Sequence, residues 1–164
     1  MKKLVTAILL IGLLGLCAQF SDARDDGDAA ALMKELKSKN PKTRTSAVLA
    51  LGKLGAIRAS DVKDAVPLVL DLLKKDKEAA VRKAAADALG RMDPDAKMTV
   101  PVLIDALKDK DAGVREAAAT ALGQFSSESN DILPALRDLQ SDKNKMVERA
   151  AKMSLKNLRE QRKQ

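Results

Sequence analysis

The sequence contains no histidine, no tryptophan and no tyrosine, and it has two phenylalanines and a single cysteine, Cys17. Without histidine the chain lacks the commonest general base, the commonest metal ligand and the usual pH-sensitive side chain. One cysteine excludes an internal disulfide and a cysteine–histidine zinc site. The scarcity of aromatic residues removes the side chains that usually anchor protein interfaces and stack on nucleic-acid bases. The composition therefore argues against most enzymes, metalloproteins and nucleic-acid-binding proteins.

Aliphatic and charged residues make up most of what remains. Hydrophobic residues account for 46% of the 164 positions and charged residues for 32%, so the chain can bury a core and stay soluble. Alanine is abundant, favours helices and lets neighbouring backbones approach closely. The length suits one compact domain or a short array of repeats.

The N-terminal residues have the pattern of a secretory signal. Two lysines follow the initiating methionine, and an apolar run then extends over residues 4–16. The run is shorter than the roughly twenty residues that a membrane-spanning helix needs. Small residues at the −3 and −1 positions favour cleavage after Ala23, and cleavage after Ala18 is also open. We expect a signal peptide over residues 1–23, a polar leader over residues 24–28, and export to the periplasm or the medium.

Two alternatives to cleavage remain open at this stage. Cys17 ends the segment Leu-Gly-Leu-Cys, which resembles a bacterial lipobox and would make this cysteine a lipid anchor. Leu16 stands where that motif has glycine, alanine or serine. The apolar run could also stay attached as an uncleaved anchor. If the signal is removed, the mature chain has no cysteine, which suits an oxidising compartment.

One helical segment recurs four times along the chain. Residues 81–90 read VRKAAADALG and residues 114–123 read VREAAATALG, and related segments occupy residues 43–52 and 146–155. The apolar residues of each copy recur at intervals of three and four, which is the spacing of one face of an α-helix. The regular return of the segment predicts an array of structural repeats.

A shorter apolar segment precedes each copy and predicts a second helix. Three of these segments carry a proline, which we expect near the start of the helix, where its missing N–H has no partner to lose. The first segment, residues 29–37, has no proline and looks truncated. The turn that follows ends in a predicted N-cap residue, which in the four repeats is Asn40, Glu78, Asp111 and Asn144.

The paired helices predict an all-α protein. One hairpin of about thirty-three residues cannot bury its apolar faces alone, whereas stacked neighbours can. We therefore expect an α-solenoid of four helical hairpins, with a loop over residues 55–60 absorbing the longer step between the first two. The expected repeats cover residues 29–55, 60–93, 98–126 and 130–158.

The repeated blocks, such as LLKKDKEAAVRKAAADALGRM and ALKDKDAGVREAAATALGQF, closely resemble HEAT repeats, particularly the short type named after phycobilisome lyases. The resemblance covers about residues 29–158. It implies a curved solenoid whose second helices line the concave side. It also implies a structural ladder in which an aspartate of the turn and an arginine of the second helix belong to the same repeat.

The ladder residues implied by the resemblance are Asp76 with Arg82 and Asp109 with Arg115. Repeat 1 has Ser38 in place of the aspartate, and repeat 4 has Glu148 in place of the arginine. We therefore expect a ladder that is complete only in the two middle repeats, with repeats 1 and 4 as caps. The alternative is an anion site formed by the row of arginines at positions 44, 82 and 115.

The resemblance implies no catalytic site in this chain. Deoxyhypusine hydroxylase, a relative of the wider group, binds iron through histidine–glutamate motifs, and phycobilin lyases and HEAT-like DNA glycosylases need pockets that this composition does not offer. The carboxylate pairs Asp93 with Asp95 and Asp109 with Asp111 lie in turns beside lysines, where we expect them to act as caps. We predict no catalytic residue, no metal and no cofactor.

Binding by such a solenoid would use the side chains that project between the apolar stripes of the second helices. We expect a contact with another protein, tuned by charge, with Leu49 and Met153 as apolar anchors. The predicted function is an exported scaffold or adaptor, and the alternative is a lyase-like accessory factor or an enzyme-associated subunit. The candidate binding residues are Thr45, Leu49, Lys83, Asp87, Glu116, Thr120, Arg149 and Met153.

The C-terminal part of the chain concentrates positive charge. The whole chain has a formal net charge of +7, and residues 143–164 hold eight lysines and arginines against two glutamates. This segment, with a basic tail over residues 159–164, predicts either a solvated end cap or a contact with an acidic protein or an anionic membrane surface. Nucleic acid is the least favoured polyanion. We expect a monomer or end-to-end association. The basic patch consists of Lys152, Lys156, Arg159, Arg162 and Lys163.

Overall fold

The fold is a stack of helical hairpins, seen here in a computed structural model that describes residues 25–163. The predicted signal peptide and Cys17 lie outside the described residues. Eight α-helices form within the described part of the chain, together with two short 3₁₀ helices. The all-α solenoid predicted from the sequence is confirmed. No helix in this part of the chain is long and apolar enough to span a membrane.

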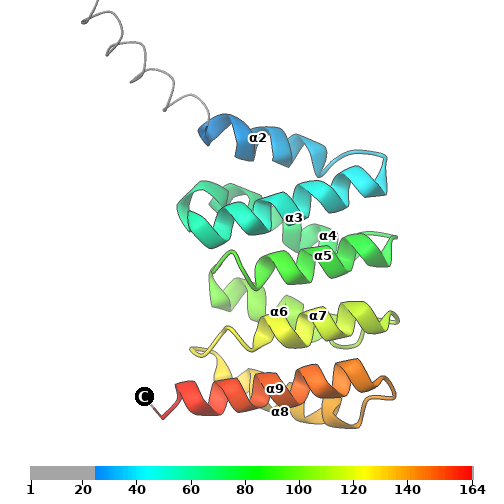
Figure 1. Ribbon diagram of the computed structural model, residues 1–164, viewed down its shortest axis with the longest axis vertical. Coiled ribbons are helices and arrows are strands. Elements are labelled where there is room, and N and C mark those ends of the chain that lie inside the picture. The colour runs from blue at the N-terminus through cyan, green and yellow to red at the C-terminus, as the bar shows by residue number, and fades with distance from the viewer. Residues whose placement is uncertain (1–24, 164) are drawn as a thin grey trace, which may run out of the picture.

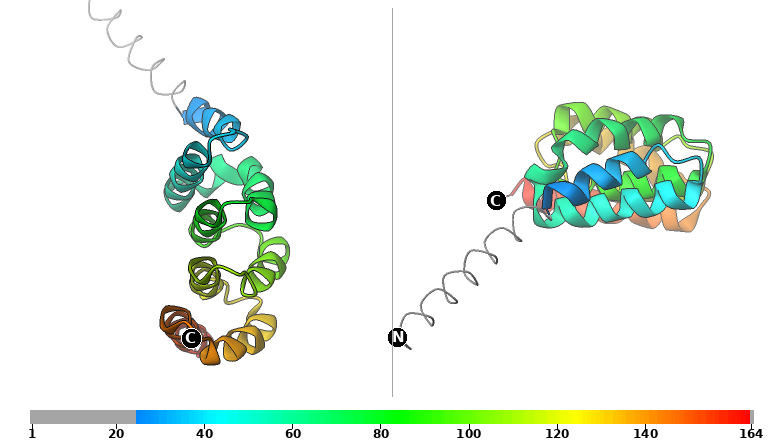
Figure 2. Two further views of the ribbon diagram at one scale, coloured as in Figure 1. Left: turned by 90° about the vertical axis from the view of Figure 1, so that its right-hand side faces the viewer. Right: turned by 90° about the horizontal axis from the view of Figure 1, so that it is seen from above.

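The helices pair in chain order and form two layers (Figure 1 and Figure 2). The second helices lie side by side along one layer: α3 (Pro41–Ile57), α5 (Ala79–Leu89), α7 (Ala112–Leu122) and α9 (Lys145–Gln161). The first helices α4 (Val66–Lys75), α6 (Ala96–Ala106) and α8 (Ser129–Asp138) form the other layer, and α2 (Asp25–Glu35) packs against α3 and η1 at the end of the stack. The 3₁₀ helices η1 (Ala59–Ala65) and η2 (Leu139–Ser141) lie before α4 and after α8. Helix α2 and helix α9 therefore lie at opposite ends of the stack.

The core repeats with the sequence. Each second helix places one leucine at the same point of the interface between the layers, and each of these leucines is at most 1% exposed. Alanines at equivalent positions fill the space between successive second helices. The repeated leucines are Leu51, Leu89, Leu122 and Leu155.

The second helices approach one another closely because a glycine follows three of these leucines. A Cβ atom on Gly52 would lie 2.9 Å from the Cα of Ala88, and one on Gly90 would lie 2.9 Å from the Cα of Ala121. A real Cβ does not approach a backbone atom so closely, so a larger residue would push the helices apart. Glycine at these positions therefore sets the spacing of the repeats.

The helix caps agree with the sequence in three of four turns. The side chains of Asn40, Asp111 and Asn144 accept hydrogen bonds from backbone N–H groups of the first helical turn. Glu78 occupies the cap position of α5 without a side-chain hydrogen bond. Asp95, one of the turn carboxylates, caps α6 by accepting from the N–H of Lys97 at 2.9 Å.

Several predicted boundaries differ from the structure. The expected loop over residues 55–60 does not form, because α3 continues to Ile57 and η1 begins at Ala59. The segment predicted as a polar leader is helical from Asp25, and the predicted basic tail begins inside α9, which extends to Gln161. In each case a neighbouring helix lengthens by a turn, which satisfies backbone groups that a loop would leave to water.

The prolines lie deeper in the first helices than predicted. Pro67 is at the start of α4, as expected, but Pro101 and Pro134 lie inside α6 and α8. Helix α6 starts earlier because Asp95 caps it more than a turn before the proline. Each internal proline lacks the N–H that would bond the carbonyl four residues earlier.

Candidate functional site

Three arginines of the second helices form regular ion pairs with turn aspartates. The Nε and Nη2 atoms of Arg82 donate to the two carboxylate oxygens of Asp109 at 2.7 and 2.8 Å. The Nη1 atom of Arg82 donates to the backbone carbonyl of Asp76 at 2.9 Å. The guanidinium thus joins its own turn to the carboxylate of the next repeat. Such a two-point contact uses the planar donor fork that lysine lacks.

The same arrangement occurs at two further interfaces. Arg44 pairs with Asp76 at 2.7 and 2.9 Å, and Arg115 pairs with Asp142 at 2.8 and 2.9 Å. The hydrogen bonds from Arg115 hold the pKa of the Asp142 carboxyl below its usual value. The three pairs connect all four repeats.

The predicted pairing within a repeat is therefore wrong, as is the prediction of a ladder confined to the middle repeats. Arg82 meets the carboxylate of Asp109 rather than that of Asp76, because the turn of the next repeat packs against the start of α5. The alternative of an anion site is also wrong, since each guanidinium is occupied by a carboxylate. Arg82 and Arg115 are 6% and 7% exposed. Their side chains connect the repeats and offer little surface to a ligand.

The eight candidate binding residues lie in register along α3, α5, α7 and α9, and we call their surface the second-helix face. Leu49 and Met153 are 42% and 61% exposed, which is high for large apolar side chains. Lys83 and Arg149 are exposed, whereas Glu116 is partly buried. Among the described residues, the charged groups of these three residues form no ion pair and no hydrogen bond, although Lys83 and Glu116 lie near the carboxylate of Asp87.

Two members of the second-helix face are engaged by their own helices. The hydroxyl of Thr45 donates to the carbonyl of Pro41 at 2.9 Å, and that of Thr120 donates to the carbonyl of Glu116 at 3.0 Å. Helical threonines commonly bond back in this way. These hydroxyls are therefore less available as donors to a partner than the sequence suggested.

Asp87 lies at the middle of the second-helix face, in a depression between α5 and α7. The depression has a volume of about 170 Å³ and is bordered by Arg91, Thr120 and Gln124. Burial raises the pKa of the Asp87 carboxyl, and the nearby Glu116 adds to that effect. No described residue donates a hydrogen bond to this carboxylate. A half-buried acceptor without a donor is a natural contact point for a partner, since pairing it removes an energetic penalty.

The basic patch at the C-terminal end is partly neutralised. Lys152 donates to Glu148, and Lys156 lies 3.9 Å from Glu160. Hydrogen bonds from Lys145 and Lys152 lower the pKa of Glu148 to about 2. Arg159, Arg162 and Lys163 are exposed in or just after the last turn of α9. The charge that is free for a partner thus lies at the end of the helix.

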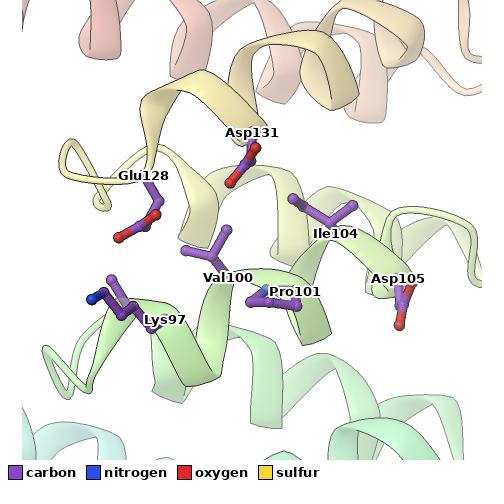
Figure 3. A pocket seen from close by; sticks show the side chains of 8 residues that line it. Lys97, Val100, Pro101, Ile104, Asp105, Glu128 and Asp131 are labelled. Carbon is purple, nitrogen blue, oxygen red and sulfur yellow. The ribbon is translucent and has the colours of Figure 1, made fainter.

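A groove that was not predicted from the sequence lies on the other layer. It lies between α6 and α8 and has a volume of about 530 Å³ (Figure 3). Val100, Pro101 and Ile104 border it from α6, and Glu128 and Asp131 border it at the start of α8. The signal that could have revealed it is Asp131, which stands where α6 has Met98.

The described residues contain no group of three or more acidic or cysteine side chains arranged to hold a metal ion. The turn carboxylates at positions 95, 109 and 111 accept backbone hydrogen bonds instead. Their chemistry in this structure is that of caps and ion pairs.

The geometry defines an α-solenoid of helical hairpins joined by arginine–aspartate pairs, and the sequence places it in a known family. A family model for HEAT repeats matches residues 29–98 and again residues 66–156. The chain belongs to the HEAT-repeat family. No curated protein matches the sequence.

Solved structures share the fold. An engineered protein is 26% identical with a TM-score of 0.65, over 80% of this chain and 62% of that one. A designed armadillo repeat protein in complex with the peptide (KR)4 is 21% identical with a TM-score of 0.64, over 77% and 62%. This chain thus spans less than two thirds of either protein. The complex of CpcE and CpcF of phycocyanin lyase from Nostoc sp. PCC7120 is 21% identical with a TM-score of 0.54, over 78% and 98%. At 21% identity, this last likeness concerns the fold.

Proposed function

We propose that the protein is an exported, non-catalytic scaffold that binds another protein through the second-helix face. One observation carries this proposal. The second helices present a row of side chains from Leu49 on α3 to Met153 on α9, none of which is buried in the core. The second helices follow the inner side of a shallow arc, which suits an elongated partner (Figure 2). Repeat proteins commonly bind through such an extended inner surface.

The side chains of this face favour a partner with mixed charge. Asp87 lacks a donor, and Lys83 and Arg149 are exposed cations on either side of the acidic Glu116. With no aromatic anchor present, the contact depends on the two exposed apolar residues and on charge pairing. Charge complementarity of this kind contributes specificity and association rate more than affinity.

Similar proteins support a binding role. The designed armadillo repeat protein is in complex with a basic peptide, and CpcE is in complex with CpcF. Those partners belong to those proteins, and at 21% identity the likeness concerns the fold. For this chain we propose only that its own inner surface holds a protein segment or subunit.

The absence of catalysis is part of the proposal. The chain has no histidine, and its regularly placed arginines and aspartates are paired with one another. A general base needs a group within reach of a substrate proton, with a pKa near the working pH. The turn carboxylates that we assigned to the ladder are committed to structural hydrogen bonds.

Affinity capture with residues 24–164 from the envelope and secreted fractions of the source tests the binding role. The variant carries Lys83→Glu, Glu116→Lys and Arg149→Glu, and circular dichroism verifies its helicity. We expect a partner that the wild type retains and the folded variant loses. A partner that both retain, but that is lost when residues 156–164 are removed, would assign binding to the basic patch instead. A captured enzyme whose activity depends on this chain would favour the accessory-subunit alternative.

Export is tested by the intact mass of the protein recovered outside the cytoplasm. We expect a mass that begins after Ala23 or Ala18. A retained Cys17 with a large added mass would instead show a lipid anchor.

A further inference from the structure

The groove between α6 and α8 has an apolar floor and an acidic side wall, formed by Glu128 and Asp131. Pro101 and Ile104 provide the accessible part of its apolar floor, since Val100 is only 2% exposed, and the carboxylates of Glu128 and Asp131 face α6 from the other side (Figure 3). Lys97 and Asp105 lie at the two ends. The negative charges outnumber the positive ones, and the groove lies on the layer opposite the second-helix face.

Comparison with the preceding repeat shows that these carboxylates are not needed by the fold. Asp95 occupies the position of Glu128 and caps α6, whereas Glu128 makes no side-chain cap hydrogen bond to α8. Met98 occupies the position of Asp131 and borders an apolar hollow between η1 and α6. The acidic side wall of Glu128 and Asp131 is thus specific to the groove of the last two repeats.

The polar groups of the groove are open to a donor. No described residue forms a hydrogen bond or an ion pair with the side chains of Glu128, Asp131 or Asp105. Lys97 is also unpaired in the described part of the chain and forms no ion pair with Glu128 or Asp131. Pro101 has no N–H to donate to the carbonyl of Lys97, which leaves this acceptor without its usual helical partner.

We propose that this groove binds an extended segment of a partner protein. Along one side of that segment, a lysine or arginine alternates with a branched apolar side chain. In an extended segment, every second side chain points to the same side at a spacing of about 6.6 Å. That spacing is close to one turn of α6, so an apolar side chain can contact Pro101 and Ile104 while the neighbouring cation meets Glu128 and Asp131.

Charge and shape favour this occupant over others. The carboxylates repel acidic segments and anionic lipid head groups, and the apolar floor gives a purely polar cation no contact. The groove is also independent of the second-helix face, so a failure of the proposed function leaves this proposal untouched.

The test uses a labelled peptide, Ser-Lys-Ser-Val-Ser-Lys-Ser-Val, and fluorescence anisotropy with residues 24–164. The matched peptides replace lysine by glutamate or valine by serine. The groove variant is Glu128→Gln with Asp131→Asn. The control variant is Asp64→Asn with Asp71→Asn, which removes the same charge from exposed positions before and within α4. Asp64 and Asp71 hold the positions that Asp131 and Asp105 hold in later repeats.

We expect saturable binding of the lysine–valine peptide that is about five- to tenfold weaker in the groove variant, because exposed ion pairs contribute modestly. The control variant should bind like the wild type, and Ile104→Ser should also weaken binding. Backbone NMR shifts should change in α6 and the start of α8.

Three results would overturn the proposal. The first is no saturable binding of the peptide, and the second is equal weakening in the groove and control variants, which would show attraction to net charge alone. The third is a set of shift changes confined to the second-helix face. A concentration-dependent dimer of the wild type that the groove variant loses would assign the groove to a second copy, whose basic C-terminal end would then be the occupant.

Discussion

The guanidinium of Arg82 holds two repeats together through three hydrogen-bonding nitrogens. Two of them bind the carboxylate of Asp109 and the third binds the carbonyl of Asp76. Lysine could not reproduce this planar fork. A buried ion pair adds little net stability relative to apolar residues of similar size, but removing one partner leaves a buried charge alone. The pair therefore fixes how one repeat docks on the next.

Arg82→Ala is expected to lower the free energy of unfolding by about 3 kcal/mol, because Asp109 stays buried without its cation. Urea denaturation measures the change, and Arg149→Ala, at an exposed position of α9, is the matched control. The double variant Arg82→Met with Asp109→Leu should recover most of the loss. A loss of less than about 0.5 kcal/mol for Arg82→Ala, as for an exposed pair, would contradict a structural role.

Thr99 is the described residue whose buried side-chain oxygen has no hydrogen-bond partner. Thr99→Val replaces the hydroxyl by a methyl group of similar size and should raise the free energy of unfolding by about 1 kcal/mol, because no desolvated polar atom remains. Thermal unfolding measures the shift. The same change at the exposed Thr120 should leave the melting temperature nearly unchanged, and a destabilised Thr99→Val would reveal a partner for the hydroxyl.

At the scale of the element, the stack of second helices depends on glycine. Gly90→Ala is expected to destabilise the protein by about 1–3 kcal/mol, although alanine is the better helix former, because its Cβ would meet the backbone of Ala121. Chemical denaturation measures the effect. Gly113→Ala is the control, since its nearest neighbours there are side-chain atoms of Asp111 and Lys83, which can move. Equal effects of the two changes would contradict the close contact.

The second helices could be predicted from the sequence because their signals are local. The apolar spacing and the caps Asn40, Asp111 and Asn144 lie within a few residues of the turns that they define. The first helices were placed less well. Pro101 lies within α6 because Asp95 caps the helix before it. The proline taken alone predicts a later start of the helix.

Contacts between repeats could not be read from one repeat. The partner of Arg82 was assigned to the nearest aspartate in the sequence, whereas the stack brings Asp109 closer. The α6–α8 groove depends on two segments that lie in different repeats. The exposure of Leu49 and Met153 agreed with expectation, because their positions follow from the helical period alone.

At the scale of the whole molecule, the regular contacts stop at both ends. Ser38 stands where an aspartate would receive an arginine from a preceding repeat. Helix α9 has charged residues at three positions of the stacking surface, namely Glu148, Lys152 and Lys156. The equivalent residues of the preceding repeat are Arg115, Ala119 and Gly123. Charged side chains replace the small residues that allow close stacking. The opposite end of the helix stack, at α2 and α3, is apolar, and Ile57 there is 81% exposed. This apolar surface does not complement the charged surface of α9.

The protein is therefore expected to be a monomer, which sedimentation velocity over a range of concentrations would establish. The variant Ser38→Asp, Glu148→Arg, Lys152→Ala and Lys156→Gly restores the repeat residues at both ends, and it should gain concentration-dependent association. A wild-type protein that forms dimers or longer chains would contradict this account of the ends.

The central claim is that the second-helix face holds a protein partner, and site-specific photo-crosslinking in the source cells tests it most directly. A photoreactive residue would replace Thr120, at the middle of the face, or Met153, towards its end. Lys108, exposed just after α6, would be the control position. The account predicts one partner crosslinked from positions 120 and 153 and none from position 108. A partner crosslinked from position 108, or from Pro101 in the α6–α8 groove, but not from position 120, would contradict it.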